Sequence, residues 1–407
     1  MKIIPGGVTA PIGFKANGLY CGIKKSKKKD LALIFSERMC DAVGVFTTNK
    51  VQASCVVINK EHLRDGRAQA IIANSGNANC MTGESGFDNS RSMISLTAKL
   101  LRIHSKDVLV GSTGVIGKPL PIKKILDAVP ELVKGLDRDG SELAASAILT
   151  TDRAAKQMAV EFPIGKRRVR IGAIAKGAGM IHPQMALNPP KHATMLCYVT
   201  TDAVISHGAL RDSLDRAVQK TFNMITIDGD MSTNDMVIVL ANGTAQNEKI
   251  VEKTEEAREF GRALETIFLN IAKAMIRDAE GATKFVEVNV RKAQSREDAR
   301  LVAKAIASSN LVKCALFGSD PNWGRIAAAV GYSGAHVDPW KIQIYLGKEL
   351  VLKNGGRVKK KTVLLNRVFA QKNIKIAVDL GLGKYSATAW TCDFSTSYVR
   401  INSAYRT

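Results

Sequence analysis

Aromatic residues are scarce in this sequence: they make up 5% of its 407 residues. Proteins that bind single strands of nucleic acid stack the bases on aromatic side chains. The net charge is +22, yet the basic runs at 24–29, 166–170 and 357–361 contain no aromatic residue. We therefore expect no nucleic-acid partner and interpret the runs as solvated faces, with attraction of small acidic substrates as the alternative.

Long apolar runs and a secretory signal are also absent. No apolar run reaches the roughly 18 residues that cross a bilayer, and residues 1–7 lack the apolar segment of a signal peptide. The seven cysteines are scattered without a Cys-x-x-Cys pair, and the six histidines show no metal-binding spacing. This pattern favours reduced thiols, a cytoplasmic location, no membrane partner and no metal site. Cys197 and Cys392 stand in strand-like segments, so we expect them in the core.

Short β-branched runs alternate with amphipathic helical patterns, which is typical of an α/β protein. The predicted strands span 43–47, 54–59, 68–73, 108–110, 169–175, 195–200, 236–241, 285–290, 341–345 and 349–352. The predicted helices span 88–104, 121–134, 140–149, 208–222, 254–278 and 296–308. A chain of this length ordinarily forms two domains. Because a new series of strand and helix begins after Thr283, the predicted domains are 1–283 and 284–407.

Three loops rich in glycine or other turn-forming residues follow predicted strands. Two are Asn74–Asn79 and Gly111–Gly114, and the third begins at Lys176 and leads to an Ala-Thr step at 193–194. An apolar strand begins directly after that step. A hydroxyl at the first residue of a strand, facing free backbone N–H groups, suits nucleophilic catalysis. A threonine in this position is ordinarily a β-former or a turn cap, so the pattern alone leaves both roles open.

Several motifs, in order along the chain, resemble those of the ornithine acetyltransferase (glutamate N-acetyltransferase) family. They lie at 176–183, 193–196, 199–203, 227–235, 277–284, 318–325, 391–394 and 400–407. The resemblance begins near Pro11 and covers nearly the whole chain. It implies an α/β fold of α+β character, in which a layered αββα-type sandwich carries the site and a smaller α/β domain follows.

The resemblance implies an enzyme of arginine biosynthesis that cuts itself between Ala193 and Thr194. The Thr194 hydroxyl attacks the Ala193 carbonyl, and hydrolysis of the resulting ester leaves Thr194 as a new N-terminus. Its α-amine titrates near ~8, so it can serve as base for its own hydroxyl, whereas a lysine amine titrates near ~10.4. The hydroxyl then carries acetyl from N-acetylornithine to glutamate in a ping-pong cycle. This chemistry uses no cofactor; acetyl-CoA as a second acetyl donor stays open.

The resemblance also assigns the other site residues. Thr113 and Gly114 stabilise the oxyanion through a hydroxyl and a backbone N–H; a plain turn is the alternative. The substrate-binding residues are Thr151, Lys176, Thr194, Glu280, Asn402 and Thr407. Lys176 suits a substrate carboxylate and Glu280 suits the ornithine ammonium, although a surface lysine and a helix-end charge would look the same. For Asn402 and Thr407 to bind substrate, the C-terminal tail must fold back over the site.

One segment departs from the family pattern. Seven residues, 186–192, stand between Met185 and Ala193 and contain two prolines, which stiffen the chain. Whether self-cleavage proceeds with this segment present stays open. The alternatives to acetyl transfer are a self-processed hydrolase such as the β-peptidyl aminopeptidases, and an uncut, inactive binding protein. The resemblance further implies a heterotetramer with two copies of each fragment.

Overall fold

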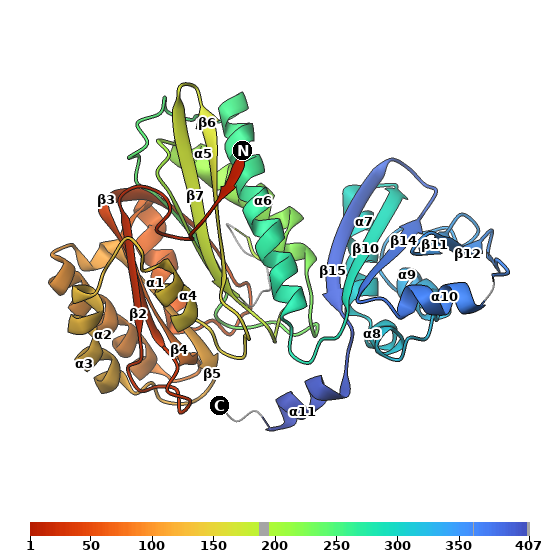
Figure 1. The fold of residues 1–407 in the computed structure, drawn as a ribbon, viewed down its shortest axis with the longest axis horizontal. Helices are drawn as coiled ribbons and strands as arrows, with labels where there is room; N and C mark the ends of the chain where they lie inside the picture. Colours follow the sequence, from red (N-terminus) through yellow and green to blue (C-terminus); the bar gives the residue numbers. More distant parts are fainter. Residues whose placement is uncertain (187–194, 361, 405–407) are drawn as a thin grey trace.

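The structure is a computed structural model that describes residues 1–186, 195–360 and 362–404. It contains two β-sheets with helices packed against them (Figure 1). The strands of the larger sheet all precede residue 242, and those of the smaller sheet all follow residue 284. The predicted α/β class is therefore confirmed, while the domain boundary near residue 283 stays a prediction.

Among the described residues, the larger sheet has nine strands in the order β1-β6-β7-β8-β9-β3-β4-β5, with β2 paired to β3. These strands are β1 (Lys2–Ile4), β2 (Phe14–Leu19), β3 (Leu31–Phe46), β4 (Arg67–Asn77), β5 (Val108–Val115), β6 (Lys156–Ile164), β7 (Arg167–Lys176), β8 (Leu196–Thr201) and β9 (Met236–Ala241). Strands β8 and β9 are parallel and lie between β7 and β3. Both are buried along their whole length, as expected for central strands with helices on both faces.

Helices cover both faces of this sheet. They are α1 (Ser54–His62), α2 (Glu84–Leu101), α3 (Ile122–Lys134), α4 (Ser141–Ala147), α5 (His207–Lys220) and α6 (Glu255–Arg277). Along β8, Cys197 and Val199 belong to the core that includes α5 and α6, whereas Leu196 and Tyr198 belong to the core that includes α1–α4. This alternation follows from the two-residue repeat of a strand.

The smaller sheet has the order β13-β12-β11-β14-β10-β15. Its strands are β10 (Phe285–Ala293), β11 (Gln343–Leu346), β12 (Glu349–Lys353), β13 (Gly356–Arg357), β14 (Asn373–Asp379) and β15 (Tyr385–Cys392), and its helices are α7 (Arg296–Ser308), α8 (Asn310–Phe317), α9 (Trp323–Gly331) and α10 (Thr362–Phe369). Its core is continuous with the core beneath α5 and α6 and contains Cys392. After β15 the chain leaves this sheet, and α11 (Thr396–Ala404) runs back toward the larger sheet (Figure 1).

Some of the predicted elements differ from the structure. The segment 54–59 is not a strand but the start of α1, because a short apolar run fits a buried helix as well as a strand. The segment 74–79 is not wholly a loop, since β4 continues to Asn77 and is buried there. Within the described residues, no helix is long and apolar enough to cross a membrane.

Candidate active site

Three strand ends meet near the predicted processing site. Strand β7 ends at Lys176, which pairs with Leu196 at the start of β8. On the other side, Leu196 pairs with Met236 at the start of β9. The polypeptide that enters β8 therefore lies between the end of one strand and the beginning of another.

Ala193, Thr194 and Thr407 lie outside the described residues. The nearest described neighbour of Thr194 is Met195, which is buried with 1% of its surface exposed. Its carbonyl oxygen accepts a hydrogen bond of 2.8 Å from the backbone N–H of Met236. This bond fixes the chain one residue after the predicted nucleophile.

The predicted oxyanion residues Thr113 and Gly114 lie in β5, not in a loop after residue 110 as predicted. Strand β5 runs parallel to β4, and Gly114 pairs with Gly76. Gly114 has φ of +134°, and a Cβ atom there would lie 2.4 Å from the carbonyl carbon of Gly76. Only glycine fits this backbone, both in its dihedral angle and in its space. Thr113 is 8% exposed.

Asn234 ties this strand to the start of β9. Its side-chain Nδ2 donates hydrogen bonds to the carbonyl oxygens of Ser112, at 2.8 Å, and Ala78, at 2.6 Å. The segment before Thr113 is thus held beside the residues that precede β9. The motif at 227–235 marked this stretch in the sequence, but it did not indicate this contact.

Lys176 is buried, with 4% of its surface exposed, which excludes the surface-lysine alternative. The next residue, Gly177, donates its backbone N–H to Asp152 Oδ1 at 2.7 Å. Burial by itself raises the pKa of Asp152, but the nearby charges of Lys176 and Lys156 outweigh it and lower that pKa to about 2. Lys156 Nζ contacts Asp152 at 2.7 Å and Asp278 at 2.6 Å.

Thr151 directly precedes this buried network of Asp152, Lys156 and Asp278. Thr151 itself is partly buried. Because Asp152 binds the backbone of Gly177, the network brings Thr151 and the end of β7 into one region. Sequence reasoning did not find Asp152 or Lys156, since nothing in their spacing indicates a partner on the glycine loop.

Glu280 lies against that same loop. Its backbone N–H donates to the carbonyl oxygen of Ala178 at 2.9 Å. A Cβ atom on Gly179 would lie 2.5 Å from the Glu280 carboxylate, so the lack of a side chain at this position makes room for the carboxylate. Asn402 Nδ2 donates a hydrogen bond of 2.9 Å to Glu280 Oε2. The structure thus brings Glu280, Asn402 and the glycine loop together.

A second contact holds α11 beside the loop. Asp228 accepts hydrogen bonds from the backbone N–H groups of Met180, at 2.6 Å, and Ile181, at 2.9 Å. Tyr398 in α11 donates its hydroxyl to the same carboxylate at 3.1 Å. The C-terminal helix α11, which ends at Ala404, therefore lies beside the glycine loop.

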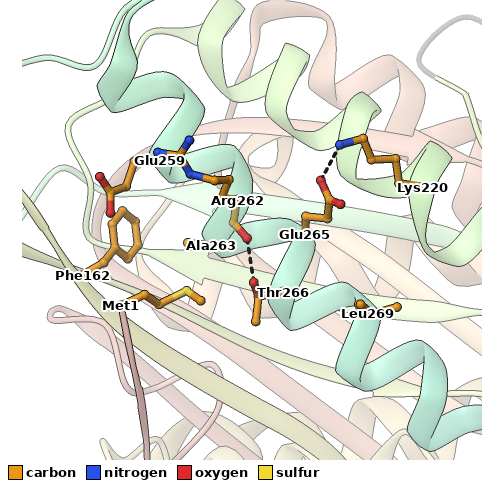
Figure 2. A pocket seen from close by; sticks show the side chains of 9 residues that line it. All are labelled: Met1, Phe162, Lys220, Glu259, Arg262, Ala263, Glu265, Thr266 and Leu269. Carbon is orange, nitrogen blue, oxygen red and sulfur yellow. Dashed lines mark hydrogen bonds and ion pairs between the residues drawn. The ribbon is translucent and has the colours of Figure 1, made fainter.

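A hollow of about 460 Å³ on the outer side of α6 contains none of the predicted site residues (Figure 2). Its Lys220 and Glu265 form an ion pair of 2.8 Å, and Arg262 pairs with Glu255 at 2.8 Å. Charges that neutralise each other on a surface give no reason to assign chemistry here. In the described part of the chain, no group of three or more His, Cys, Asp or Glu side chains is placed to hold a metal ion.

Known proteins resemble the chain over its full length. Residues 15–407 match the sequence model of the ArgJ family. An arginine biosynthesis bifunctional protein ArgJ of Caldanaerobacter subterraneus is 48% identical over 411 residues, and a glutamate N-acetyltransferase of Methanocaldococcus jannaschii is 45% identical over 419; each match covers 100% of both chains. A crystal structure of arginine biosynthesis bifunctional protein argJ from Bacillus halodurans is 43% identical with a TM-score of 0.51, and the match covers 52% of this chain and 100% of that chain. The relationship indicated by the motifs is confirmed, and the chain belongs to the ArgJ family.

Proposed function

We propose that the chain cuts itself between Ala193 and Thr194 and then transfers acetyl from N2-acetyl-L-ornithine to L-glutamate, with Thr194 as the acyl carrier. As a member of the ArgJ family the chain is an acyltransferase; the proposal concerns its substrates and its mechanism. One observation carries it: β8, the strand that follows Thr194, begins between Lys176 and the start of β9.

The nucleophile and its oxyanion donors come from separate parts of the sequence. The hydroxyl of Thr194 attacks the acetyl carbonyl, and the amine freed by cleavage takes its proton. Thr113 and Gly114 donate hydrogen bonds to the negative oxygen that forms. Removing one such donor costs about 3–4 kcal/mol of transition-state stabilisation. The bonds from Asn234 to Ser112 and Ala78 support this assignment, because they hold β5 beside the start of β9.

Charge complementarity supports the choice of substrates. Both substrates carry an α-carboxylate, and Lys176 supplies a buried positive charge at the end of β7. N-acetylornithine also carries a side-chain ammonium, which the Glu280 carboxylate binds with Asn402 as its neighbour. Thr151, which precedes Asp152, lies in the same region as Lys176 and is proposed to contact the substrate too. The side chain of glutamate carries a carboxylate and no ammonium. The pairing with Glu280 therefore acts only in the first half-reaction, in which N-acetylornithine is bound.

The length of the solved relative supports cleavage. The whole Bacillus halodurans chain matches 52% of this chain, so that polypeptide is about half as long. A cut between 193 and 194 divides this chain near its middle. We propose a complex of two copies of each fragment. Relatives named bifunctional support acetyl-CoA as a second acetyl donor, which glutamate receives directly.

Purified protein is incubated with N-acetylornithine, with and without glutamate, and its intact mass and N-terminal sequences are determined. We expect two fragments, one beginning at Thr194, and ornithine release that depends on glutamate after the first turnover. Equal ornithine release without glutamate would identify a hydrolase. A single species of 43.9 kDa without turnover would identify an uncut, inactive protein.

A further inference from the structure

Lys24 differs from the other lysines of the basic run in which it stands. Lys25, Lys27 and Lys28 are exposed, as expected of a solvated face, but Lys24 is half-buried. Burial takes water away from an ammonium group, and folded proteins usually compensate for that loss with a partner. The position of Lys24 therefore needs an explanation other than solubility.

Asp30 holds the backbone around Lys24 in place. Its carboxylate accepts the N–H groups of Cys21 at 2.6 Å, Ile23 at 2.8 Å and Lys24 at 2.9 Å. The Lys24 ammonium itself donates to the neutral carbonyl oxygen of Lys29 at 2.7 Å. In the described part of the chain this is its only hydrogen bond, although an ammonium has three N–H groups. Lys24 therefore keeps donors for a further, negatively charged partner.

The aliphatic part of Lys24 packs against the end of β4. A Cβ atom on Gly76 would lie 3.1 Å from Lys24 Cγ, so a side chain at this position would crowd the lysine. Gly76 pairs with Gly114, one of the two predicted oxyanion residues. Lys24 thus lies beside the strands β4 and β5 at the point where the acetyl oxygen is proposed to bind.

Further contacts link the end of β4 to the end of β7. Ser75 Oγ donates to the carbonyl oxygen of Ala147, the last residue of α4, at 2.5 Å. A few residues later, Asp152 accepts the backbone N–H of Gly177 at 2.7 Å. Gly177 directly follows Lys176, the buried cation of the proposed substrate site. The two strand ends therefore belong to one region.

Lys24 and Lys176 also act on each other through their charges. Burial lowers the pKa of Lys24 to about 8; the negative charge of Asp30 opposes this, and the positive charge of Lys176 lowers the pKa further. Because this pKa stays above 7, Lys24 is mainly protonated at neutral pH. Two like charges that repel each other in an empty site are both stabilised by a ligand that brings two negative groups.

We propose that Lys24 binds the side-chain carboxylate of glutamate, the acetyl acceptor, while Lys176 binds its α-carboxylate. This inference rests on the proposed function. N-acetylornithine carries one carboxylate and one ammonium, whereas glutamate carries two carboxylates. Glu280, which suits the ammonium, repels the side chain of glutamate, so the acceptor needs a separate cation. Lys24 supplies it and thereby determines which acceptor the site prefers.

Lys24→Met removes the charge and keeps an unbranched side chain that can pack on Gly76. In a ping-pong cycle, kcat/KM for each substrate reports its own half-reaction, so cut protein is assayed with varied N-acetylornithine and with varied glutamate. We expect kcat/KM for glutamate to fall about 10- to 100-fold, since a charge-assisted hydrogen bond is lost, and kcat/KM for N-acetylornithine to change less than about twofold. Lys24→Arg, which keeps the charge, should retain part of the activity with glutamate.

Glutamine as acceptor distinguishes recognition of charge from a structural effect. It has nearly the size of glutamate, but its side chain is neutral. The unaltered chain should prefer glutamate over glutamine by about tenfold or more in kcat/KM. Lys24→Met should use glutamine as well as the unaltered chain does. Equal losses with glutamate, glutamine and N-acetylornithine would show that Lys24 does not bind the side chain of glutamate.

Lys25→Met is the matched control. Lys25 is the next residue in the chain and is exposed, and its replacement lowers the net charge by the same amount. This variant should keep kcat/KM for both substrates within about twofold, because solvent and salt screen an exposed charge. Equal losses with glutamate in the Lys24 and Lys25 variants would assign the effect to general attraction of anions and overturn the inference.

The inference and the proposed function fail in different ways. If Lys24→Met does not fold, Lys24→Arg and the unaltered chain decide: both should prefer glutamate, and equal kcat/KM for glutamate and glutamine contradicts the inference. If the unaltered chain stays in one piece, or transfers acetyl to neither acceptor, the proposed function itself fails. A cut, active chain whose use of glutamate does not depend on Lys24 refutes the inference alone.

Discussion

Asn402 Nδ2 lies 2.9 Å from Glu280 Oε2, although 122 positions separate the two residues in the sequence. The contact joins α11 to the segment that follows α6. Together with the bond from Tyr398 to Asp228, it holds the C-terminal helix against the glycine loop. A residue near the end of the chain thereby lies in the region where substrate is proposed to bind.

Asn402→Ala tests this contact through substrate affinity. The amide orients the Glu280 carboxylate toward the ornithine ammonium, so its loss should raise KM for N-acetylornithine roughly five- to tenfold and leave kcat within about twofold. Steady-state kinetics with varied N-acetylornithine measure this. Ser403→Ala is the control, because the Ser403 hydroxyl donates to the Arg400 carbonyl of its own helix and has no other hydrogen bond within the described part of the chain. Equal KM values for both variants would contradict a role of Asn402 in binding.

Gly114→Ala tests the oxyanion backbone. The added Cβ would meet Gly76 at 2.4 Å and would force an L-residue into φ of +134°. We expect self-cleavage to fall below detection and the thermal midpoint to drop by several degrees. Gly117→Ala is a matched control: its φ is +78°, but nothing lies within 4 Å of the added atom. That variant should lose about 1 kcal/mol and still cut, as gels of both precursors can show.

Asn234→Ala tests whether β5 must be tied to the start of β9. Loss of the bonds to Ser112 and Ala78 should lower kcat about 10- to 100-fold with little change in KM, since the oxyanion donors act mainly in the transition state. Asn242→Ala provides the comparison. Asn242 is similarly buried and bonds to the Ile12 carbonyl at the far end of β9. Its variant should lose comparable stability but keep kcat; equal kcat losses would assign Asn234 a purely structural role.

Asp152 should make stability depend on acid pH. Its folded pKa of about 2 lies below its ordinary value of 3.8, so the ionised form is favoured by folding. This stabilisation is complete above the unfolded value and is lost as pH falls through the folded one. It amounts to about 2 kcal/mol. Urea unfolding between pH 6 and pH 2 measures it. The stability difference between the unaltered chain and Asp152→Asn should shrink as pH falls below about 4; a constant difference would refute this.

Parts of the fold followed directly from the sequence. The predicted bounds of β9 and α7 match the structure, because β9 is an uninterrupted apolar run with Val-Ile-Val at its centre and Ser295 caps α7 by accepting the N–H of Asp298. The prediction of a strand at 54–59 is wrong, since a helix and a strand bury such a short apolar segment equally well. A local sequence pattern distinguishes a helix from a strand only where the hydrophobic repeat or a capping residue differs between them.

The site was less predictable than the fold. The motifs indicated Lys176, Glu280 and Asn402 through resemblance, and the structure brings Glu280 and Asn402 into contact. No pattern indicated that Asn234 binds Ser112, or that Asp235 is buried without a hydrogen-bond partner among the described residues, because both facts depend on which strands are neighbours. Strand order is a property of the whole chain, and the residues concerned lie 122 positions apart in the first case.

The order of strands in the larger sheet constrains what a cut at residue 194 can do. Strands β8 and β9 would belong to the second fragment, yet they lie between β7 and β3 of the first. The two polypeptides would then be woven through one sheet, and neither could leave without breaking two hydrogen-bonded ladders. Refolding from denaturant would become a second-order process, so recovery of the cut protein would depend on concentration while recovery of the uncut precursor would not.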